Sequence, residues 1–148
     1  MAHEIERKFL VAGPLWSRGG DHIIQGILAR HPMVRVRVRA GRGYLTVKGR
    51  QDGITRPEWE YEIPLEDAQE MLALCTAFTE KVRYKVEYAG HLWEVDVFEG
   101  DNQGLVVAEI ELKAEDETFE RPPWLGEEVS DDPRYLNVNL AETPFSRW

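Results

Sequence analysis

The 148-residue sequence predicts an α+β fold, mainly antiparallel β, whose strands close or nearly close into a barrel. Seven or eight segments alternate polar and apolar residues with the period of two that is typical of strands, and about one helix lies between them. In most of these segments one face is ionic, with both signs present. If the ionic faces point outward, the fold is a sandwich. If they point inward, they need water, a multivalent anion and cations, because a dry interior cannot hold that many charges.

The first expected strand, residues 3–9, places Glu4, Glu6 and Lys8 on one face and apolar residues on the other. Two carboxylates ~7 Å apart, with an ammonium group one step further on, can hold a hard divalent cation together with its anionic ligand. The alternative is a solvated strand face, on which glutamate and lysine are ordinary. Repetition of the pattern in later strands favours the binding site.

Basic faces follow in the segments 33–39 and 44–48. Three arginines, including Arg35 and Arg37, alternate with three valines in the first segment, and Lys48 ends the second. Aligned arginines repel one another on a solvated face, and a guanidinium group is well shaped to hold phosphate oxygens with two hydrogen bonds. These strands are therefore expected to face phosphate.

The remaining strands continue the ionic alternation. An acidic stripe runs along each of the segments 55–63, 93–97 and 105–113. A basic stripe runs along the segment 81–86. The charged residues of these stripes are Glu58, Glu60, Glu62, Lys81, Arg83, Lys85, Glu94, Asp96, Glu109 and Glu111. Inward ionic faces put Trp59, Tyr61 and Trp93 on the outside of the barrel, where they need cover from helices or from a second subunit.

Helices are expected at two places. One begins after Pro64, with acids in its first turn and apolar residues at helical spacing up to Phe78. It includes Cys75, which is expected to fill the core because no partner base is placed beside it. The other begins with an aspartate N-cap and Pro133 in its first turn. The polar connection 114–120 is a candidate for a short helix.

Composition limits the class of protein. The length fits one domain, residues 1–148, and 43% hydrophobic with 30% charged residues is ordinary for a soluble globular protein. No apolar run is long enough for a membrane span. A single cysteine makes the cytoplasm the default location. The net charge of −9 argues against a non-specific nucleic-acid binder.

These strands resemble those of the CYTH family, also called triphosphate tunnel metalloenzymes, whose hallmark is a Glu-x-Glu-x-Lys motif on the first strand. The likeness runs in order over nearly the whole chain. Its motifs are Glu4-Ile5-Glu6-Arg7-Lys8, Arg35-Val36-Arg37, Tyr44-Leu45-Thr46-Val47-Lys48, Arg56-Pro57-Glu58-Trp59-Glu60, Glu80-Lys81-Val82-Arg83-Tyr84, Glu94-Val95-Asp96-Val97-Phe98, Glu109-Ile110-Glu111, Trp124-Leu125-Gly126-Glu127-Glu128-Val129 and Asp132-Pro133-Arg134-Tyr135.

The resemblance implies a closed eight-stranded tunnel-like barrel with a few flanking helices, and it implies roles for the ionic residues. Those that would hold triphosphate are Lys8, Arg35, Arg37, Lys48, Lys81, Arg83 and Arg134, the last of which would close over one mouth. Those that would bind Mg²⁺ or Mn²⁺ are Glu4, Glu6, Glu109 and Glu111. Those that would act in catalysis are Glu4, Glu6, Lys8, Glu58 and Glu60, with Asp96 as a further acid of the tunnel.

A glutamate of the Glu4/Glu6 or Glu58/Glu60 pair is the better candidate for orienting or deprotonating the attacking water. Lys8 would need a pKa depressed by neighbouring cations, which nearby carboxylates oppose. Relatives often carry Tyr-Leu after Gln25-Gly26, whereas this chain has Ile27-Leu28. A lysine–tyrosine partnership with Lys8 is therefore not expected.

The chain looks most like short single-domain bacterial members, many of which hydrolyse inorganic triphosphate. The alternatives are thiamine-triphosphatase or adenylate cyclase activity, and a polyphosphate- or RNA-binding module without turnover. An organic triphosphate needs a pocket for its ring, and no stretch of the sequence indicates one. A protein that only binds polyanions has no use for the acid clusters unless a metal ion is bound there. A homodimer is left open by the sequence.

Overall fold

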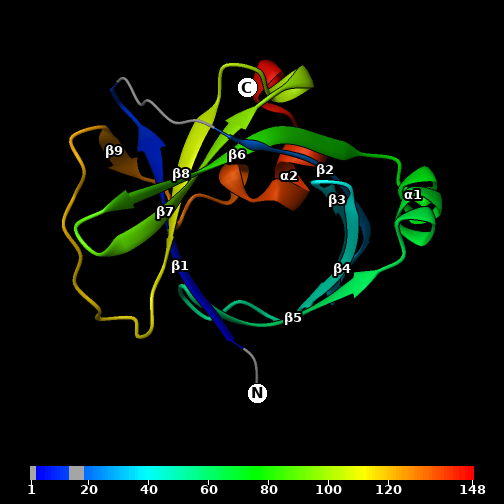
Figure 1. The fold of residues 1–148 in the computed structure, drawn as a ribbon, viewed down its shortest axis with the longest axis horizontal. Coiled ribbons are helices and arrows are strands. Elements are labelled where there is room, and N and C mark those ends of the chain that lie inside the picture. The colour runs from blue at the N-terminus through cyan, green and yellow to red at the C-terminus, as the bar shows by residue number, and fades with distance from the viewer. Residues whose placement is uncertain (1–2, 14–18) are drawn as a thin grey trace.

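A computed structural model describes residues 3–13 and 19–148. Its first eight strands form a closed antiparallel barrel (Figure 1). They are β1 (His3–Val11), β2 (Asp21–Arg30), β3 (Met33–Arg39), β4 (Arg42–Lys48), β5 (Thr55–Ile63), β6 (Phe78–Tyr88), β7 (His91–Phe98) and β8 (Val106–Glu111). The order around the ring is β5-β4-β3-β2-β6-β7-β8-β1, and β1 pairs with β5 to close it. The expectation of an eight-stranded antiparallel barrel is confirmed.

A ninth strand, β9 (Leu125–Glu128), lies outside the barrel against β1 (Figure 1). The helix α1 (Leu65–Leu74) covers the outer face of β2, β3 and β4. The helix α2 (Asn137–Glu142) lies against β2 and β6, near the end of the chain. Short 3₁₀ turns occupy Gly100–Asn102, Pro133–Tyr135 and Phe145–Arg147. No helix of the described residues is long and apolar enough to cross a membrane.

Three local expectations were wrong. The connection 114–120 is not helical, because the Glu117 carboxylate accepts bonds from the Lys113 amide and the His91 ring and folds the segment as a turn. The helix α1 ends at Leu74 instead of continuing to residue 78. The predicted Asp132 cap and Pro133 in the first turn are present, but they begin a single 3₁₀ turn, and the last α-helix starts only at Asn137, after the extended residue Leu136.

Two of the three apolar clusters lie outside the barrel wall. One gathers on the outer faces of β1, β7 and β8 around Phe9 and Trp93. A second lies under the C-terminal segment around Leu140 and includes Phe98 and Val107, which share the inward strand face with Asp96 and Glu109 and fill one end of the barrel. A third lies between α1 and the barrel, where Ala68 and Cys75 pack against Val36. Cys75 is therefore a core residue, as expected. The strands bury most of their apolar side chains outward because their inward faces are largely ionic.

Two of the three large exterior aromatic residues have no full cover. Trp93 is 0% exposed, because Phe119 and Trp124 from the segment that follows β8 pack on its ring. Trp59 and Tyr61 on β5 remain 36% and 60% exposed. The predicted need for cover is met at β7 by the chain's own connection. At β5 it is not met within the described residues.

Replacing these two tryptophans should have very different effects on stability. Trp93→Ala empties the centre of a packed cluster and should cost about 3–5 kcal/mol. The melting temperature should then fall by more than ~6 °C. Trp59→Ala is the matched control and should shift the melting temperature by less than ~2 °C, since the ring already meets solvent. Equal shifts in thermal unfolding would mean that the cluster around Trp93 is not the core.

Candidate active site

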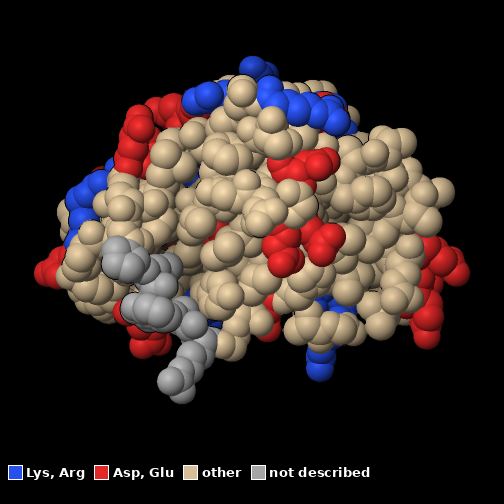
Figure 2. Space-filling view, turned by 90° about the horizontal axis from the view of Figure 1, so that it is seen from above, with Lys and Arg blue, Asp and Glu red and all other residues tan. Residues whose placement is uncertain are grey.

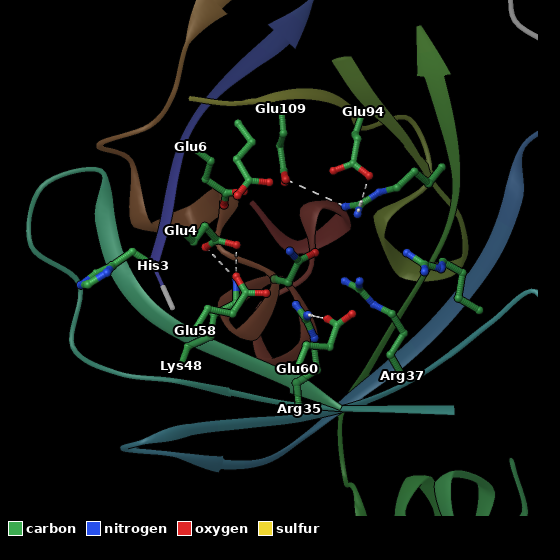
Figure 3. Close-up of a pocket in the computed structure, with 14 residues that line it drawn as sticks. His3, Glu4, Glu6, Arg35, Arg37, Lys48, Glu58, Glu60, Glu94 and Glu109 are labelled. Carbon is green, nitrogen blue, oxygen red and sulfur yellow. Dashed lines mark hydrogen bonds and ion pairs between the residues drawn. The ribbon is translucent and has the colours of Figure 1, made fainter. Parts of the chain in front are cut away.

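The barrel encloses a cavity of about 380 Å³ that is lined only by polar and charged side chains (Figure 3). The lining residues are His3, Glu4, Glu6, Arg35, Arg37, Arg39, Lys48, Glu58, Glu60, Arg83, Glu94, Glu109, Glu111 and Asn137. The ionic faces therefore point inward, which is the second of the two orientations considered from the sequence. The outer face shown in Figure 2 is mostly uncharged, with acidic and basic side chains in separate groups.

The order of the strands separates the two signs of charge. Acidic strands β7, β8, β1 and β5 are neighbours around the ring, and the strands β4, β3, β2 and β6, which carry most of the cations, complete it. In Figure 3 the carboxylates of Glu4, Glu6 and Glu109 accordingly lie across the cavity from Arg37. One wall can thus attract a cation while the opposite wall attracts an anion.

The acidic wall crowds carboxylates on two neighbouring strands. Glu6 on β1 pairs in register with Glu111 on β8. Burial, with Glu109 and Glu4 nearby, raises the pKa of Glu6 to about 8. Burial and a hydrogen bond with Glu58 raise the pKa of Glu4 to about 7, against the influence of Lys48. These groups resist ionisation in the empty protein, and a divalent cation would remove the repulsion.

Glu109 behaves differently from its neighbours on that wall. Burial acts to raise its pKa, but Lys8 and Arg83 outweigh burial and bring it to about 2. Its carboxylate lies 3.5 Å from Lys8 Nζ and 3.9 Å from Arg83 Nη2. Glu109 therefore stays ionised and links the acidic wall to the cations below it.

Beside the acidic wall, β4 and β5 hold a mixed network. Lys48 Nζ donates to both carboxylate oxygens of Glu4, at 2.9 and 3.0 Å, and lies 3.7 Å from Glu58. Thr46 accepts a bond from Arg35 Nη2 at 3.1 Å and donates to Glu60 at 3.0 Å. Thr46 thus fixes the carboxylate of Glu60 beside a guanidinium group.

Among the described residues, the deepest charges form a buried network that reaches the cavity only through Arg83. Asp96 is 1% exposed and lies 2.7 Å from both Lys81 Nζ and Arg83 Nε. Burial acts to raise the pKa of Asp96, but these two cations lower it well below its usual range. Lys81 also donates to Asn137 at the start of α2, at 3.2 Å. The C-terminal segment is therefore bonded to the inner end of the tunnel.

Lys8 is held as a cation. Its Nζ donates to the Tyr135 carbonyl at 3.1 Å, and it is buried. Burial acts to lower its pKa, but Glu109 and Glu6 outweigh burial and the pKa is raised. Ile27 pairs with Arg35 and has no hydroxyl to offer. The geometry therefore favours a structural or anion-binding lysine over a base.

Arg134 is not brought into the tunnel. Its side chain is 58% exposed, pairs with Asp132 at 2.7 Å and stacks on the Trp148 ring at 4.7 Å. A separate group outside the tunnel, His22, Glu80 and Glu99, brings its ligand atoms within 4.8 Å of one another on the exposed surface. The other predicted substrate-binding, metal-binding and catalytic residues line the cavity or lie directly beneath it, whereas Glu62 and Lys85 of the ionic stripes are exposed.

Sequence patterns missed some residues of the site. Arg39 and Glu94 continue stripes that the alternation had already shown, so their place in the lining could have been inferred. Asn137 lines the cavity from the C-terminal segment, and only the tertiary fold brings it there. Gln25 faces Arg37 across β2 and β3 but carries no charge, so the ionic pattern passed over it.

Comparison with known proteins agrees with this architecture. A family profile for the CYTH domain matches residues 26–142. The chain is similar to an inorganic triphosphatase of Acetivibrio thermocellus, with 47% identity covering 100% of this chain and 99% of that protein. It is also similar to an inorganic triphosphatase of Nitrosomonas europaea, with 38% identity covering 93% and 96% of the two chains.

Among solved structures, the crystal structure of the inorganic triphosphatase NE1496 superimposes with a TM-score of 0.70. Its sequence is 34% identical, and the match covers 95% of each chain. The profile spans most of the sequence, and the curated relatives match over nearly their full length. The chain therefore belongs to the CYTH domain family.

Proposed function

We propose that the protein hydrolyses inorganic triphosphate to pyrophosphate and orthophosphate with a bound divalent cation, Mg²⁺ or Mn²⁺. The observation that carries this proposal is the lining of the tunnel, which has a basic wall and an acidic wall. Such a cavity suits a polyanion and a cation at the same time. The names of the two relatives, inorganic triphosphatase, support the same substrate.

The lining also argues against an organic triphosphate. A purine or a thiamine ring is usually held by apolar or aromatic side chains. Among the described residues, the cavity is lined by no aliphatic side chain and by no aromatic ring other than the imidazole of His3. Thiamine-triphosphatase and adenylate cyclase activity are therefore weaker proposals, and a binding module without turnover leaves the acidic wall without a purpose.

In the proposed reaction the basic wall binds the substrate. Arg35, Arg37 and Arg83 would hold phosphoryl oxygens and orient the chain, with Lys48 at the boundary with the acids. Lys8 and Lys81 lie deeper and would add positive potential from beneath. Arg134 lies outside the tunnel, so its proposed contact requires the side chain to leave Asp132 and Trp148.

The acidic wall fits a hard divalent cation. Glu4, Glu6, Glu109 and Glu111 would supply oxygen ligands from two paired strands, where burial together with neighbouring carboxylates raises the pKa values of Glu4 and Glu6. When bound, the cation would neutralise charge that develops on the phosphoryl oxygens.

A carboxylate of β5 is the best placed group for orienting the attacking water. Glu60 is held by Thr46 and lies 3.6 Å from Arg35, so it borders the basic wall where phosphate would bind. Glu58 is paired with Lys48 and Glu4. A cytoplasmic location and a homodimer stay predictions.

Removal of divalent cations should abolish the activity. With EDTA present, orthophosphate release from tripolyphosphate should fall to background, and excess Mg²⁺ should restore it. Mn²⁺ should substitute. Undiminished release in the chelator would contradict the role given to the acidic wall.

Substitutions on the acidic wall and on the basic wall should impair the activity in different ways. Glu111→Ala removes a proposed cation ligand, so its activity should fall at low Mg²⁺ and recover in part at high Mg²⁺. Arg37→Ala removes a phosphate contact, so its KM should rise at every Mg²⁺ concentration and its kcat should fall. A Mg²⁺ titration of both variants makes the comparison. Parental Mg²⁺ dependence of Glu111→Ala would remove Glu111 from the set of ligands.

Glu6→Gln should stabilise the metal-free protein at alkaline pH. The folded pKa of Glu6, about 8, lies above its ordinary value of 4.5, so the folded state holds a proton that the unfolded state releases. The stability of the parent therefore falls as pH rises between these values. At pH 8.5 the variant should melt at least ~5 °C above the parent, and at pH 5 within ~1 °C of it. An equal difference at both values would mean that Glu6 does not titrate in this range.

A further inference from the structure

Arg37 differs from the other buried cations of the tunnel in having no carboxylate partner among the described residues; Arg39, which is only half-buried, also lacks one and stacks on the Tyr44 ring. In the described part of the chain, Lys8, Arg35, Lys48, Lys81 and Arg83 each lie within 4.0 Å of a carboxylate oxygen. Arg37 has no such contact there, although it is only 5% exposed. Its guanidinium group points into the cavity (Figure 3). Among these cations, Arg37 keeps the least compensated charge.

The only side-chain hydrogen bond of Arg37 to a described residue goes to a neutral amide. Gln25 is its direct cross-strand neighbour on β2, and Gln25 Oε1 accepts from Arg37 Nε at 2.7 Å. This bond fixes one edge of the guanidinium plane. It leaves both terminal amino groups for a ligand, which is the arrangement that holds phosphate oxygens in pairs.

The orientation of the Gln25 amide is forced by this contact. A guanidinium group only donates, so the oxygen of Gln25 must face it and the nitrogen must face away. Gln25 is 1% exposed, and its Nε2 has no partner among the described residues. A buried amide nitrogen left unpaired destabilises the folded protein. A glutamate at this position would pair with Arg37 as a counterion.

We propose that Gln25 is a positioning residue for substrate binding: its neutral side chain orients Arg37 without neutralising it. The charge of Arg37 stays available for a phosphoryl group, and the empty protein is less stable for it. Burial, with Arg35 and Arg83 nearby, lowers the pKa of Arg37, which is the sign expected of a cation that lacks a counterion. This inference rests on the proposed triphosphate substrate.

The substitution Gln25→Glu tests the proposal, because it adds one charge with little change of shape. Paired with Arg37, the new carboxylate should raise the melting temperature of the empty protein. It should also weaken tripolyphosphate binding at least tenfold, measured by calorimetry in EDTA. In the steady state KM should rise more than kcat falls. Gln103→Glu, on an exposed turn, makes the same change in net charge and should leave the Kd and the melting temperature as in the parent.

A second variant keeps the proposal falsifiable if Gln25→Glu folds poorly. Gln25→Leu removes the acceptor without adding charge, so it should weaken tripolyphosphate binding without raising the melting temperature. In an Arg37→Met background, Gln25→Leu should change the Kd less than twofold, because Gln25 acts through Arg37. A full additional loss of affinity in that background would overturn the proposal.

A failure of the proposed activity can be distinguished from a failure of the role proposed for Gln25. A parent protein that binds tripolyphosphate but releases no orthophosphate would refute the activity alone. A Gln25→Glu variant with the parental Kd and melting temperature would refute the role of Gln25 alone.

Discussion

The balance of charge within the barrel wall is the constraint on which the rest of this structure depends. Asp96 is almost completely buried and lies 2.7 Å from two cations, Lys81 and Arg83, on the neighbouring strand. Removing one member of such a buried set leaves an uncompensated charge, typically at a cost of about 3–5 kcal/mol. Inward ionic faces are tolerated because most of the cations have acids within reach across the strands.

The balance is incomplete at two places, and both face the cavity. On the acidic wall, Glu4 and Glu6 have raised pKa values because burial and like charges outweigh Lys48. On the basic wall, Arg37 has a neutral amide as its partner where Arg35 and Arg83 have carboxylates. These are the places where a cation and an anion would complete the balance. The stability that the empty protein gives up there is available for binding its ligands.

Polar lining has a consequence for folding, because most of the hydrophobic core must then lie outside the barrel. The helix α1 and the connection from β8 to β9 supply the second layer that the outward apolar faces require. The C-terminal segment covers inward apolar side chains at one end of the barrel. The C-terminal segment, which includes α2, also brings Asn137 to Lys81 and so joins the inner end of the tunnel to the core. The segments that stabilise the fold therefore also shape the site.

Much of this was predictable because a strand repeats every two residues. The alternation of Arg35 and Arg37 with valines, or of Glu58 and Glu60 with aromatic residues, fixes which residues share a face. The alternation does not determine which face points into the barrel. That orientation was implied by the resemblance to the CYTH family. Local expectations failed where side chains compete with the helix, as Glu117 does in the connection that was expected to be helical.

The residues missed by sequence reasoning share a physical cause. Asn137 reaches the tunnel only through tertiary packing. Gln25 matters because its side chain is neutral, and a search for alternating charges does not detect a neutral residue. Arg134 was assigned from a motif, but the fold turns it toward Asp132 and Trp148. The period-two pattern identifies the charged residues that form the walls of the tunnel. The residues at its ends and its uncharged residues depend on contacts between distant segments, which the pattern does not show.

The most direct test is a crystal structure with tripolyphosphate and Mn²⁺, in which anomalous scattering locates the cation. The charge-balance account predicts Mn²⁺ among Glu4, Glu6, Glu109 and Glu111, and phosphoryl groups against Arg35, Arg37 and Arg83. Mn²⁺ found instead at the exterior group of His22, Glu80 and Glu99, with no phosphate density in the tunnel, would contradict it.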